Sequence, residues 1–143
     1  MRKDNSYAIK QIYAWLPVLL WALLIFRFSS GIVPVASTVL WQDFAVKKTG
    51  HVLLFGTMAA LIYRALIMNK VSKIESAMYA VVLSMFYGAT DEFHQMFTQG
   101  RESRIRDVFI DGLGAFIAIL IIYKFFEKLP KKLQTFLLEL GFK

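Results

Sequence analysis

The sequence contains no cysteine and is poor in charge, and both deficits exclude whole classes of protein. Without cysteine there is no disulfide scaffold, no thiolate metal site and no cysteine nucleophile. Charged residues make up 19% of the 143 positions, against about 25% in ordinary globular domains. Hydrophobic residues make up 57%, and thirteen phenylalanines cannot all be buried in one small core. The composition therefore indicates an integral membrane protein.

Four apolar stretches account for this composition. They cover residues 11–26, 49–68, 76–90 and 108–123. Each charge-free core is shorter than the roughly 20 residues of a full span, so Arg27, Arg64 and Lys124 are expected at span ends. The alternative is a soluble bundle of four buried helices, but residues 77–87 lack the polar face of a soluble helix. We therefore predict an all-α integral membrane four-helix bundle.

The placement of charge predicts the orientation of this bundle. If the N-terminus is cytoplasmic, the cytoplasmic side holds eleven cations and four anions, and the opposite side holds six of each. The eleven are Arg2, Lys3, Lys10, Arg64, Lys70, Lys73, Lys124, Lys128, Lys131, Lys132 and Lys143. Because Lys and Arg favour the cytoplasmic side, both termini are predicted to be cytoplasmic. The excess charge of +7 then faces anionic membrane lipids rather than nucleic acid.

The links between the spans complete this layout. Residues 29–31 break the first helix and open an outer loop of about twenty residues before the second span. The short link 69–73 predicts that the second and third spans are antiparallel neighbours. Two pairs of small residues would let helices approach closely in lipid, namely Gly56-x-x-x-Ala60 and Gly114-x-x-x-Ala118.

The chain is expected to divide into a membrane domain, residues 1–128, and a tail, residues 129–143. Pro130 is a good first helical residue, and Gly141 is a typical helix end. Between them, four apolar residues fall on one helical face: Leu133, Phe136, Leu137 and Leu140. We therefore predict a short amphipathic helix that lies in the cytoplasmic interface of the membrane.

Polar residues gather where the second and fourth spans begin and the third ends, which is one membrane face in this topology. They are Lys48, His51, Asp91, Glu92, His94, Gln95, Arg101, Asp107 and Asp111. On a helix, Asp91, His94 and Gln95 project from one side, and Asp107 and Asp111 share a face. A charge inside a span costs about 2.5 to 3.5 kcal/mol, which makes Asp111 a functional candidate.

Each of these residues also has a structural explanation. Asp111 can pair with an arginine and fix helix packing, and the two histidines can be hydrogen-bonded groups at the interface. Arg101 and the arginines after it can bind lipid phosphates, although Arg101 is also the expected partner of a carboxylate. Solvation alone does not require three separate segments to converge on one face. That convergence favours a functional site.

The same residues resemble the sequence pattern of the VanZ-like family. The specific part of the pattern is Asp91-Glu92-x-x-Gln95, followed by Gly100-Arg101 and then Asp107. Weaker matches are Lys48-x-x-His51, Phe26-x-x-Ser29-Ser30 and Asp111-x-x-Gly114. Gln99 stands where members often have proline. Asp111 stands where many have asparagine, which puts in doubt any role that needs an amide there.

The resemblance implies a small, four-span protein of the bacterial cell membrane. It further implies action on the cell envelope at the outer membrane face. The family is named after a protein linked to resistance to teicoplanin-type lipoglycopeptides, an antibiotic resistance that need not extend to every member.

The residue chemistry leaves three functional readings open, and the chain is an enzyme in only one of them. As a binding or protection module, the protein would hold the anionic head of a lipid-linked envelope precursor or a lipoglycopeptide. The ligand-binding residues would be Lys48, His51, Gln95 and Arg101. As a lipid transporter, it would neutralise a polar head group during its crossing, with only Arg64 to assist in the inner half of the spans.

The third reading is an intramembrane hydrolase or transferase that acts on a lipid-linked substrate. Carboxylates and histidines can serve as general acids and bases. The catalytic residues would be Asp91, Glu92, His94, Asp107 and Asp111. Carboxylates with few histidines also suit a hard divalent cation such as Mg²⁺ as a cofactor.

Overall fold

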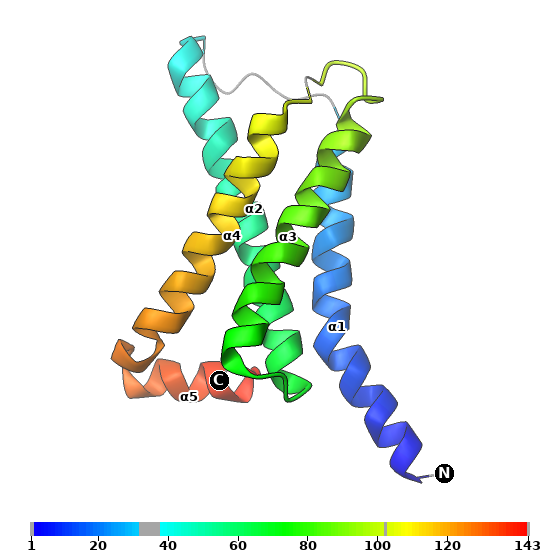
Figure 1. Ribbon diagram of the computed structural model, residues 1–143, viewed down its shortest axis with the longest axis vertical. Coiled ribbons are helices and arrows are strands. Elements are labelled where there is room, and N and C mark those ends of the chain that lie inside the picture. Colours follow the sequence, from blue (N-terminus) through cyan, green and yellow to red (C-terminus); the bar gives the residue numbers. More distant parts are fainter. Residues whose placement is uncertain (1, 32–37, 102, 143) are drawn as a thin grey trace.

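The computed structural model describes residues 2–31, 38–101 and 103–142. These residues form five α-helices and one 3-10 helix, and none of them belongs to a strand. The elements are α1 (Arg2–Ser29), α2 (Leu40–Met68), α3 (Lys73–Gln95), α4 (Ile105–Phe125), η1 (Phe126–Lys128) and α5 (Lys131–Glu139). The described chain is therefore all-α, as the composition predicts (Figure 1).

Three segments are long and apolar enough to cross a membrane: Ser6–Ser29, Leu40–Met68 and Ile105–Lys128. Helix α3 has 23 residues but does not reach the same apolarity. It carries charge at both ends, with Lys73 and Glu75 at the start and Asp91 and Glu92 near the finish. The three long apolar helices are consistent with a multi-pass membrane protein.

Helix α2 begins earlier than the sequence predicted. We expected a loop of about twenty residues before a span at residue 49, whereas the helix already starts at Leu40. An ion pair of 2.6 Å between Asp43 and Lys47, four residues apart, is the kind that supports a helix in this polar segment. As a result, Lys48 and His51 lie inside a continuous helix rather than at its entrance.

Helix α2 is central and packs against α1, α3 and α4. It approaches α4 most closely at two glycines. A Cβ atom on Gly114 would lie 2.6 Å from the carbonyl oxygen of Val52, and one on Gly56 would lie 3.3 Å from the Cβ atom of Ala118. Side chains at the glycines would force the helices apart, so these small residues permit the α2–α4 contact.

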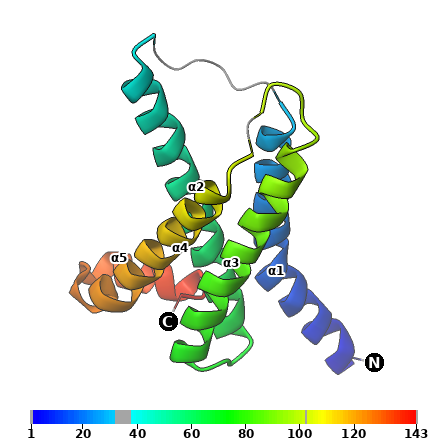
Figure 2. The same cartoon turned by 45° about the horizontal axis from the view of Figure 1, so that its top comes forward.

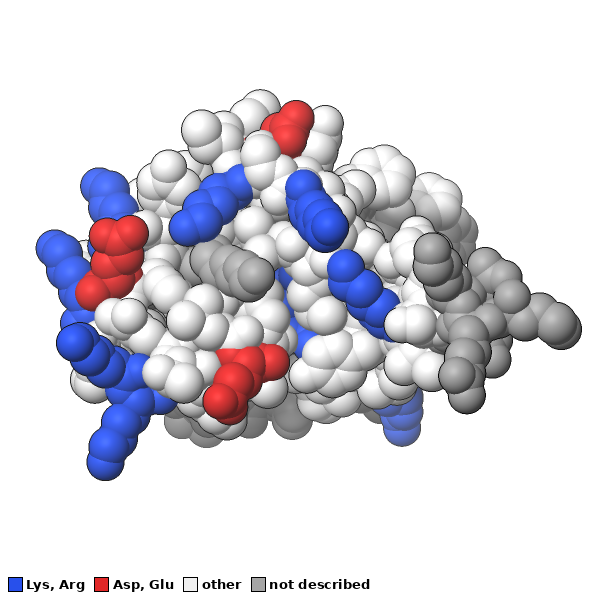
Figure 3. Space-filling view, turned by 90° about the horizontal axis from the view of Figure 1, so that it is seen from below, with Lys and Arg blue, Asp and Glu red and all other residues white. Residues whose placement is uncertain are grey.

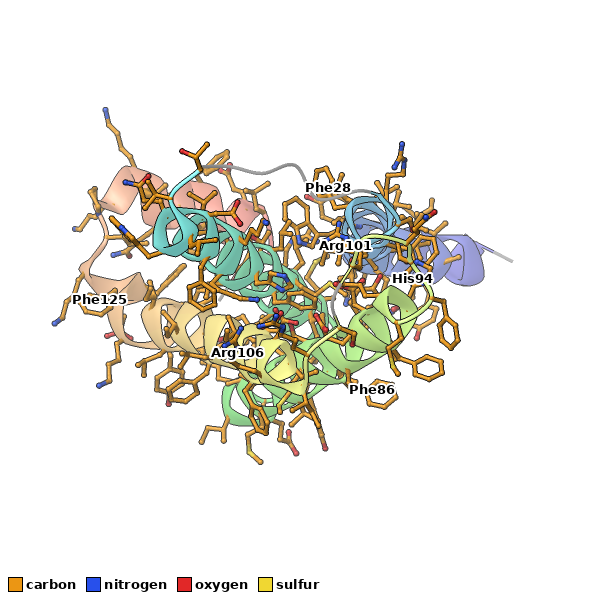
Figure 4. All side chains as sticks on the ribbon, turned by 90° about the horizontal axis from the view of Figure 1, so that it is seen from above. Phe28, Phe86, His94, Arg101, Arg106 and Phe125 are labelled. Atoms are coloured by element: carbon orange, nitrogen blue, oxygen red, sulfur yellow. The ribbon has the colours of Figure 1, made fainter. Side chains whose placement is uncertain are left out.

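Large apolar side chains cover the outside of the helices as well as the core. Phe55 and Ile62 are buried between the helices, whereas Leu53 is 64% exposed and Phe86 is 68% exposed. Figure 4 shows Phe86 pointing away from the other helices. A surface this apolar is costly in water but matches the hydrocarbon of a bilayer.

Both chain ends lie at the same end of the molecule, and α5 lies across it (Figure 1). Helix α5 ends as predicted, because Gly141 adopts a left-handed conformation with φ of 98°. Arg64 donates to the carbonyl oxygens of Leu140 and Tyr13 and lies over the Tyr13 ring, so it ties α5 to α1 and α2. Figure 3 shows that Lys and Arg outnumber acidic residues on this face.

Candidate functional site

A pocket lies at the end of the molecule opposite the chain ends. The N-terminal half of α2 forms one wall, and the end of α3, the 96–104 connection and the start of α4 form the other. Figure 2 shows α2 diverging from α1 toward this end. The pocket has a volume of about 620 Å³, and its polar lining comprises Asp43, Lys47, Lys48, His51, Gln95, Arg101, Arg104, Arg106 and Asp107.

Two pairs of polar side chains connect α2 to α4. The Nζ atom of Lys48 lies 2.5 Å from Oδ2 of Asp107, and Nδ1 of His51 lies 2.9 Å from Oδ1 of Asp111. Residues 48 and 51 are three apart, and residues 107 and 111 are four apart, so each set shares one helix face. Asp111 is completely buried, and the Asp107 side chain is 7% exposed.

Helix α3 approaches the same carboxylates at Gly88. A Cβ atom at this position would lie 2.9 Å from Oδ2 of Asp111 and 3.1 Å from its Cβ atom. Both distances are too short for any side chain without a shift of the helix or of the carboxylate. Gly88 therefore lets the α3 backbone pass directly over Asp111.

Glu92 connects α3 to α4. Its Oε2 atom accepts a hydrogen bond of 2.8 Å from the backbone N–H of Arg104, the residue that precedes the first turn of α4. The first N–H groups of a helix lack partners within the helix, and the N-terminus carries partial positive charge. The Glu92 carboxylate therefore supplies an acceptor to the start of α4 although it is almost fully buried.

Asp91 faces α1 rather than α4. Its Oδ2 atom accepts hydrogen bonds from the Ser29 hydroxyl at 2.7 Å and from the Gln95 amide at 2.8 Å. Gln95 also donates to the Ser29 oxygen at 3.3 Å. The three side chains form a buried network that attaches the end of α3 to the end of α1.

His94 lies outside the pocket lining and contacts the end of α1. Its ring packs 4.5 Å from the Phe26 ring, and its Nε2 atom lies 3.1 Å from the Ser30 hydroxyl oxygen. Ser30 donates its only hydroxyl proton to the Phe26 carbonyl at 2.7 Å, so His94 must donate to Ser30. In this arrangement His94 cannot act as a base toward Ser30.

Arg101 closes the site on the α1 side. Its guanidinium donates to the carbonyl oxygens of Phe28 and Gly31, which are acceptors at the C-terminal end of α1. Burial lowers the pKa of Arg101, and the negative charges of Asp91 and Glu92 oppose this effect. The sequence led us to expect a carboxylate as its hydrogen-bond partner. In the structure the partners are backbone carbonyls, and the carboxylates act on Arg101 through space.

Within the part of the chain that the structure describes, each of four buried carboxylates has one oxygen that accepts no hydrogen bond. These atoms are Asp91 Oδ1, Glu92 Oε1, Asp107 Oδ1 and Asp111 Oδ2. A buried acceptor left without a partner costs about 1 to 3 kcal/mol, and more if it is charged. In addition, ligand atoms from His51, Glu92 and Asp107 lie within 4.8 Å of one another, so these residues are able to hold a metal ion.

The structure gathers most of the predicted site residues, with one clear outlier. Lys48, His51, Gln95, Arg101 and Asp107 line the pocket. Asp111 and Glu92 lie behind the lining, where Asp111 contacts His51 and Glu92 accepts the N–H of Arg104. Asp91 lines a smaller adjoining cavity of about 50 Å³ with His51, Gln95 and Arg101. His94 lies apart, on the α1–α3 side of the molecule, whereas Arg106 lies on the α4 side (Figure 4).

Sequence reasoning gave no role in the site to several residues that contribute to it, among them Asp43, Lys47 and Arg104 of the pocket lining. Ser29 was visible in the family pattern but received no role, and Gly88 has no signal that separates it from any other helical glycine. Arg106 and Phe44 face one another, with the guanidinium carbon 5.1 Å from the ring centroid. Phe44 would have been a candidate if the start of α2 had been predicted at Leu40.

Comparison with known proteins gives one result. A family model described as VanZ/LLP1 matches residues 4–127, a range that contains every residue of the site. Neither the curated proteins nor the solved structures contain a match to the chain. The chain belongs to the VanZ/LLP1 family, in agreement with the resemblance of its sequence pattern.

Proposed function

We propose that this VanZ/LLP1 protein binds the anionic head group of a lipid-like envelope molecule in the pocket at the end of α2 and α4. The observation that carries the proposal is the separation of charge within the site. In the pocket lining, Lys47, Arg104 and Arg106 are exposed or half-exposed, whereas Asp107 is buried, as is Asp111 behind His51. A phosphate or carboxylate that enters this opening meets cations first.

The pocket also offers apolar contacts beside the cations. Leu40, Phe44 and Leu54 belong to its lining, and Leu40 is 89% exposed. These residues lie on a helix long and apolar enough to span a membrane, so the pocket is adjacent to lipid in that arrangement. A ligand with a charged head and a long apolar chain fits such a surface better than a small soluble anion does.

We place the pocket on the outer face of the cell membrane, with both termini in the cytoplasm and α3 as a fourth span of a four-helix bundle. Two observations support this orientation. The chain ends lie at the end of the molecule opposite the starts of α2 and α4 (Figure 1), whose residues line the pocket, and the predicted cytoplasmic segments hold eleven of the seventeen Lys and Arg residues. In this orientation, α5 lies along the cytoplasmic interface.

The outer face restricts the choice of ligand. A lipid-linked envelope precursor presents its anionic head there, and a teicoplanin-type lipoglycopeptide combines a polar body with an acyl chain. Both have the chemistry that the pocket matches. Capture of either molecule in the pocket would give a route to teicoplanin-type resistance, the property that the VanZ-like resemblance suggests.

Binding can be tested with the purified protein in nanodiscs of phosphatidylcholine and a polyprenyl phosphate as the probe. The double variant Arg104→Gln, Arg106→Gln should bind at least about tenfold more weakly, since each charge-assisted hydrogen bond contributes about 1.5 to 3 kcal/mol. Arg27→Gln is the matched control, because Arg27 is an exposed arginine near the end of α1 and outside the pocket lining. Equal affinity in all three proteins would contradict the proposal.

A second candidate is an intramembrane hydrolase or transferase on the same type of ligand. The specific observation is the set of buried carboxylate oxygens that accept no hydrogen bond among the described residues, together with the His51–Asp111 pair, in and beside the pocket. Asp91→Asn and Glu92→Gln keep side-chain volume and remove charge. For an enzyme, turnover of the lipid should fall about 10² to 10⁴-fold while the folded protein keeps its affinity for the lipid. If both variants keep wild-type envelope function, the enzymatic role is excluded and the binding role remains.

A further inference from the structure

His51, Glu92 and Asp107 form a cluster of metal-binding side chains that comes from three different helices. One ligand atom from each residue lies within 4.8 Å of the other two. Glu92 and Asp107 are 4% and 5% exposed, so both carboxylates are almost completely removed from solvent. Three helices converge their donors on one point only in the folded protein, which distinguishes this cluster from a run of surface acids.

The hydrogen bonds around the cluster leave specific donor atoms for a cation. Glu92 uses Oε2 to accept the N–H of Arg104 and has no partner at Oε1. Asp107 uses Oδ2 to accept from Lys48 and has no hydrogen-bond partner at Oδ1. Among the described residues, the second oxygen of each carboxylate is buried and accepts no hydrogen bond, although Nε of Arg106 lies 3.8 Å from Oδ1 of Asp107.

His51 is oriented in the way that metal-binding histidines commonly are. The Nδ1 atom lies 2.9 Å from Oδ1 of Asp111, a contact that favours the neutral tautomer with its proton on Nδ1 and the carboxylate as acceptor. The neutral imidazole then has its lone pair at Nε2. A carboxylate behind the ring fixes the tautomer and makes the second nitrogen a better ligand. Asp111 is therefore a positioning residue for His51.

We infer that His51, Glu92 and Asp107 bind a hard divalent cation, Mg²⁺ or Mn²⁺, at the floor of the pocket. Two carboxylates and one imidazole favour such a cation over a soft one. Mg²⁺ usually keeps several waters and is shared between one or two carboxylates and a phosphate group of the ligand. This inference rests on the proposed function, because the cation would connect the acidic floor to the anionic head group that the arginines at the opening attract.

The experiment uses Mn²⁺ alone as the probe, with the full-length protein in phosphatidylcholine nanodiscs and no anionic lipid. Binding is followed by electron paramagnetic resonance of free Mn²⁺ and by metal content after dialysis. We expect about one ion per chain in the wild type. Glu92→Gln should weaken binding by at least tenfold, since the amide oxygen can still accept the Arg104 N–H while the charged ligand is lost. Asp111→Asn should weaken binding about 10 to 100-fold through His51.

Asp43→Asn is the matched control, because Asp43 is an acid of the pocket wall that lies outside the cluster. It should bind Mn²⁺ like the wild type, and all variants should keep the wild-type elution volume and helical circular dichroism. No binding by the wild type, or equal affinity in Glu92→Gln and Asp43→Asn, overturns the metal site. If the wild-type protein binds Mn²⁺ but not polyprenyl phosphate, the proposed ligand is overturned and the metal site is not.

Discussion

Asp111 illustrates how single residues control this site. His51 pairs with one of its oxygens, and the absence of a side chain at Gly88 leaves the space that the other oxygen occupies. Protein interiors are packed about as densely as organic crystals, so a completely buried carboxylate tolerates little change around it. A residue without any functional group is therefore as necessary to the site as its histidine.

The first prediction concerns this space. Gly88→Ala places a Cβ atom 2.9 Å from Oδ2 of Asp111, so helix α3 or the carboxylate must move. We expect a loss of about 1 to 3 kcal/mol in the free energy of unfolding, the usual cost of overpacking, seen as a lower Tm in detergent. Gly50→Ala is the control, since its Cβ atom meets nothing within 4 Å and alanine is the better helix former. Equal melting temperatures would show that α3 does not press on Asp111.

At the scale of residues, the sequence indicated which side chains belong to the site better than what each of them contacts. Helical spacing placed Asp107 and Asp111 on one face, and the structure shows both turned toward α2. The partners of Arg101 and Glu92 could not be predicted in this way. Both depend on where the residues between α3 and α4 lie, since Arg101 brings its guanidinium to the end of α1 and Arg104 its backbone N–H to Glu92.

At the scale of elements, helix α1 receives a backbone hydrogen bond from a side chain of its neighbour α2. Pro17 lies inside the helix and lacks the N–H that would otherwise donate to the carbonyl of Tyr13, four residues earlier. Arg64 of α2 donates to this carbonyl at 3.3 Å and also to that of Ala14. Arg64 was expected only as a cation near the end of a span. In the structure it is 5% exposed and replaces the backbone donor that proline removes.

The second prediction tests whether the Arg64 side chain replaces the N–H donor that Pro17 lacks. Arg64→Met should lower the free energy of unfolding by about 1 to 3 kcal/mol, because buried carbonyls lose their donor. Pro17→Ala restores an N–H to the Tyr13 carbonyl, so it should stabilise the Arg64→Met protein more than the wild type. The coupling energy from this double-mutant cycle should be about 0.5 to 3 kcal/mol, measured by denaturant unfolding in micelles. Strictly additive effects of the two changes would show that Arg64 does not replace the missing N–H of Pro17. Arg27→Met is the control, because Arg27 is exposed and its replacement should show no coupling to Pro17→Ala.

The type and order of the elements were predictable, and their ends were less so. Four long apolar stretches predicted four helices, because a helix in lipid needs a long apolar segment and the polar segments between them are links. The short amphipathic pattern after Pro130 predicted the fifth helix. The start of α2 was predicted nine residues late, since the polar and charged residues Gln42, Asp43, Lys47 and Lys48 end the apolar stretch but not the helix. Backbone hydrogen bonds continue a helix through residues that hydropathy alone assigns to a loop.

The whole molecule separates its charges into two ends with an apolar belt between them. The end with the chain termini carries mostly Lys and Arg (Figure 3), and the opposite end combines exposed arginines with buried carboxylates. Exposed apolar side chains such as Leu19, Leu53 and Phe116 cover the helices in between. This layout is what a membrane imposes on a chain that crosses it, and it makes the orientation of the molecule the premise of the proposed function.

The third prediction tests that orientation directly. The chain has no cysteine, so single cysteines can be introduced without background labelling. Gln99→Cys lies in the connection beside the pocket, and Ser72→Cys lies in the link between α2 and α3 near the chain termini; both positions are exposed. In intact cells, a membrane-impermeant maleimide should label the cysteine at position 99 and not that at position 72.

Permeabilised cells supply the control for this experiment, because both cysteines should then react. If position 72 is labelled in intact cells and position 99 is not, the pocket faces the cytoplasm, and an outer-face envelope ligand is excluded. The metal site would survive that result, because its three ligands depend on how α2, α3 and α4 pack rather than on which side they face. The topology experiment and the Mn²⁺ experiment therefore test independent parts of the proposal, one the orientation of the protein and the other the chemistry of its site.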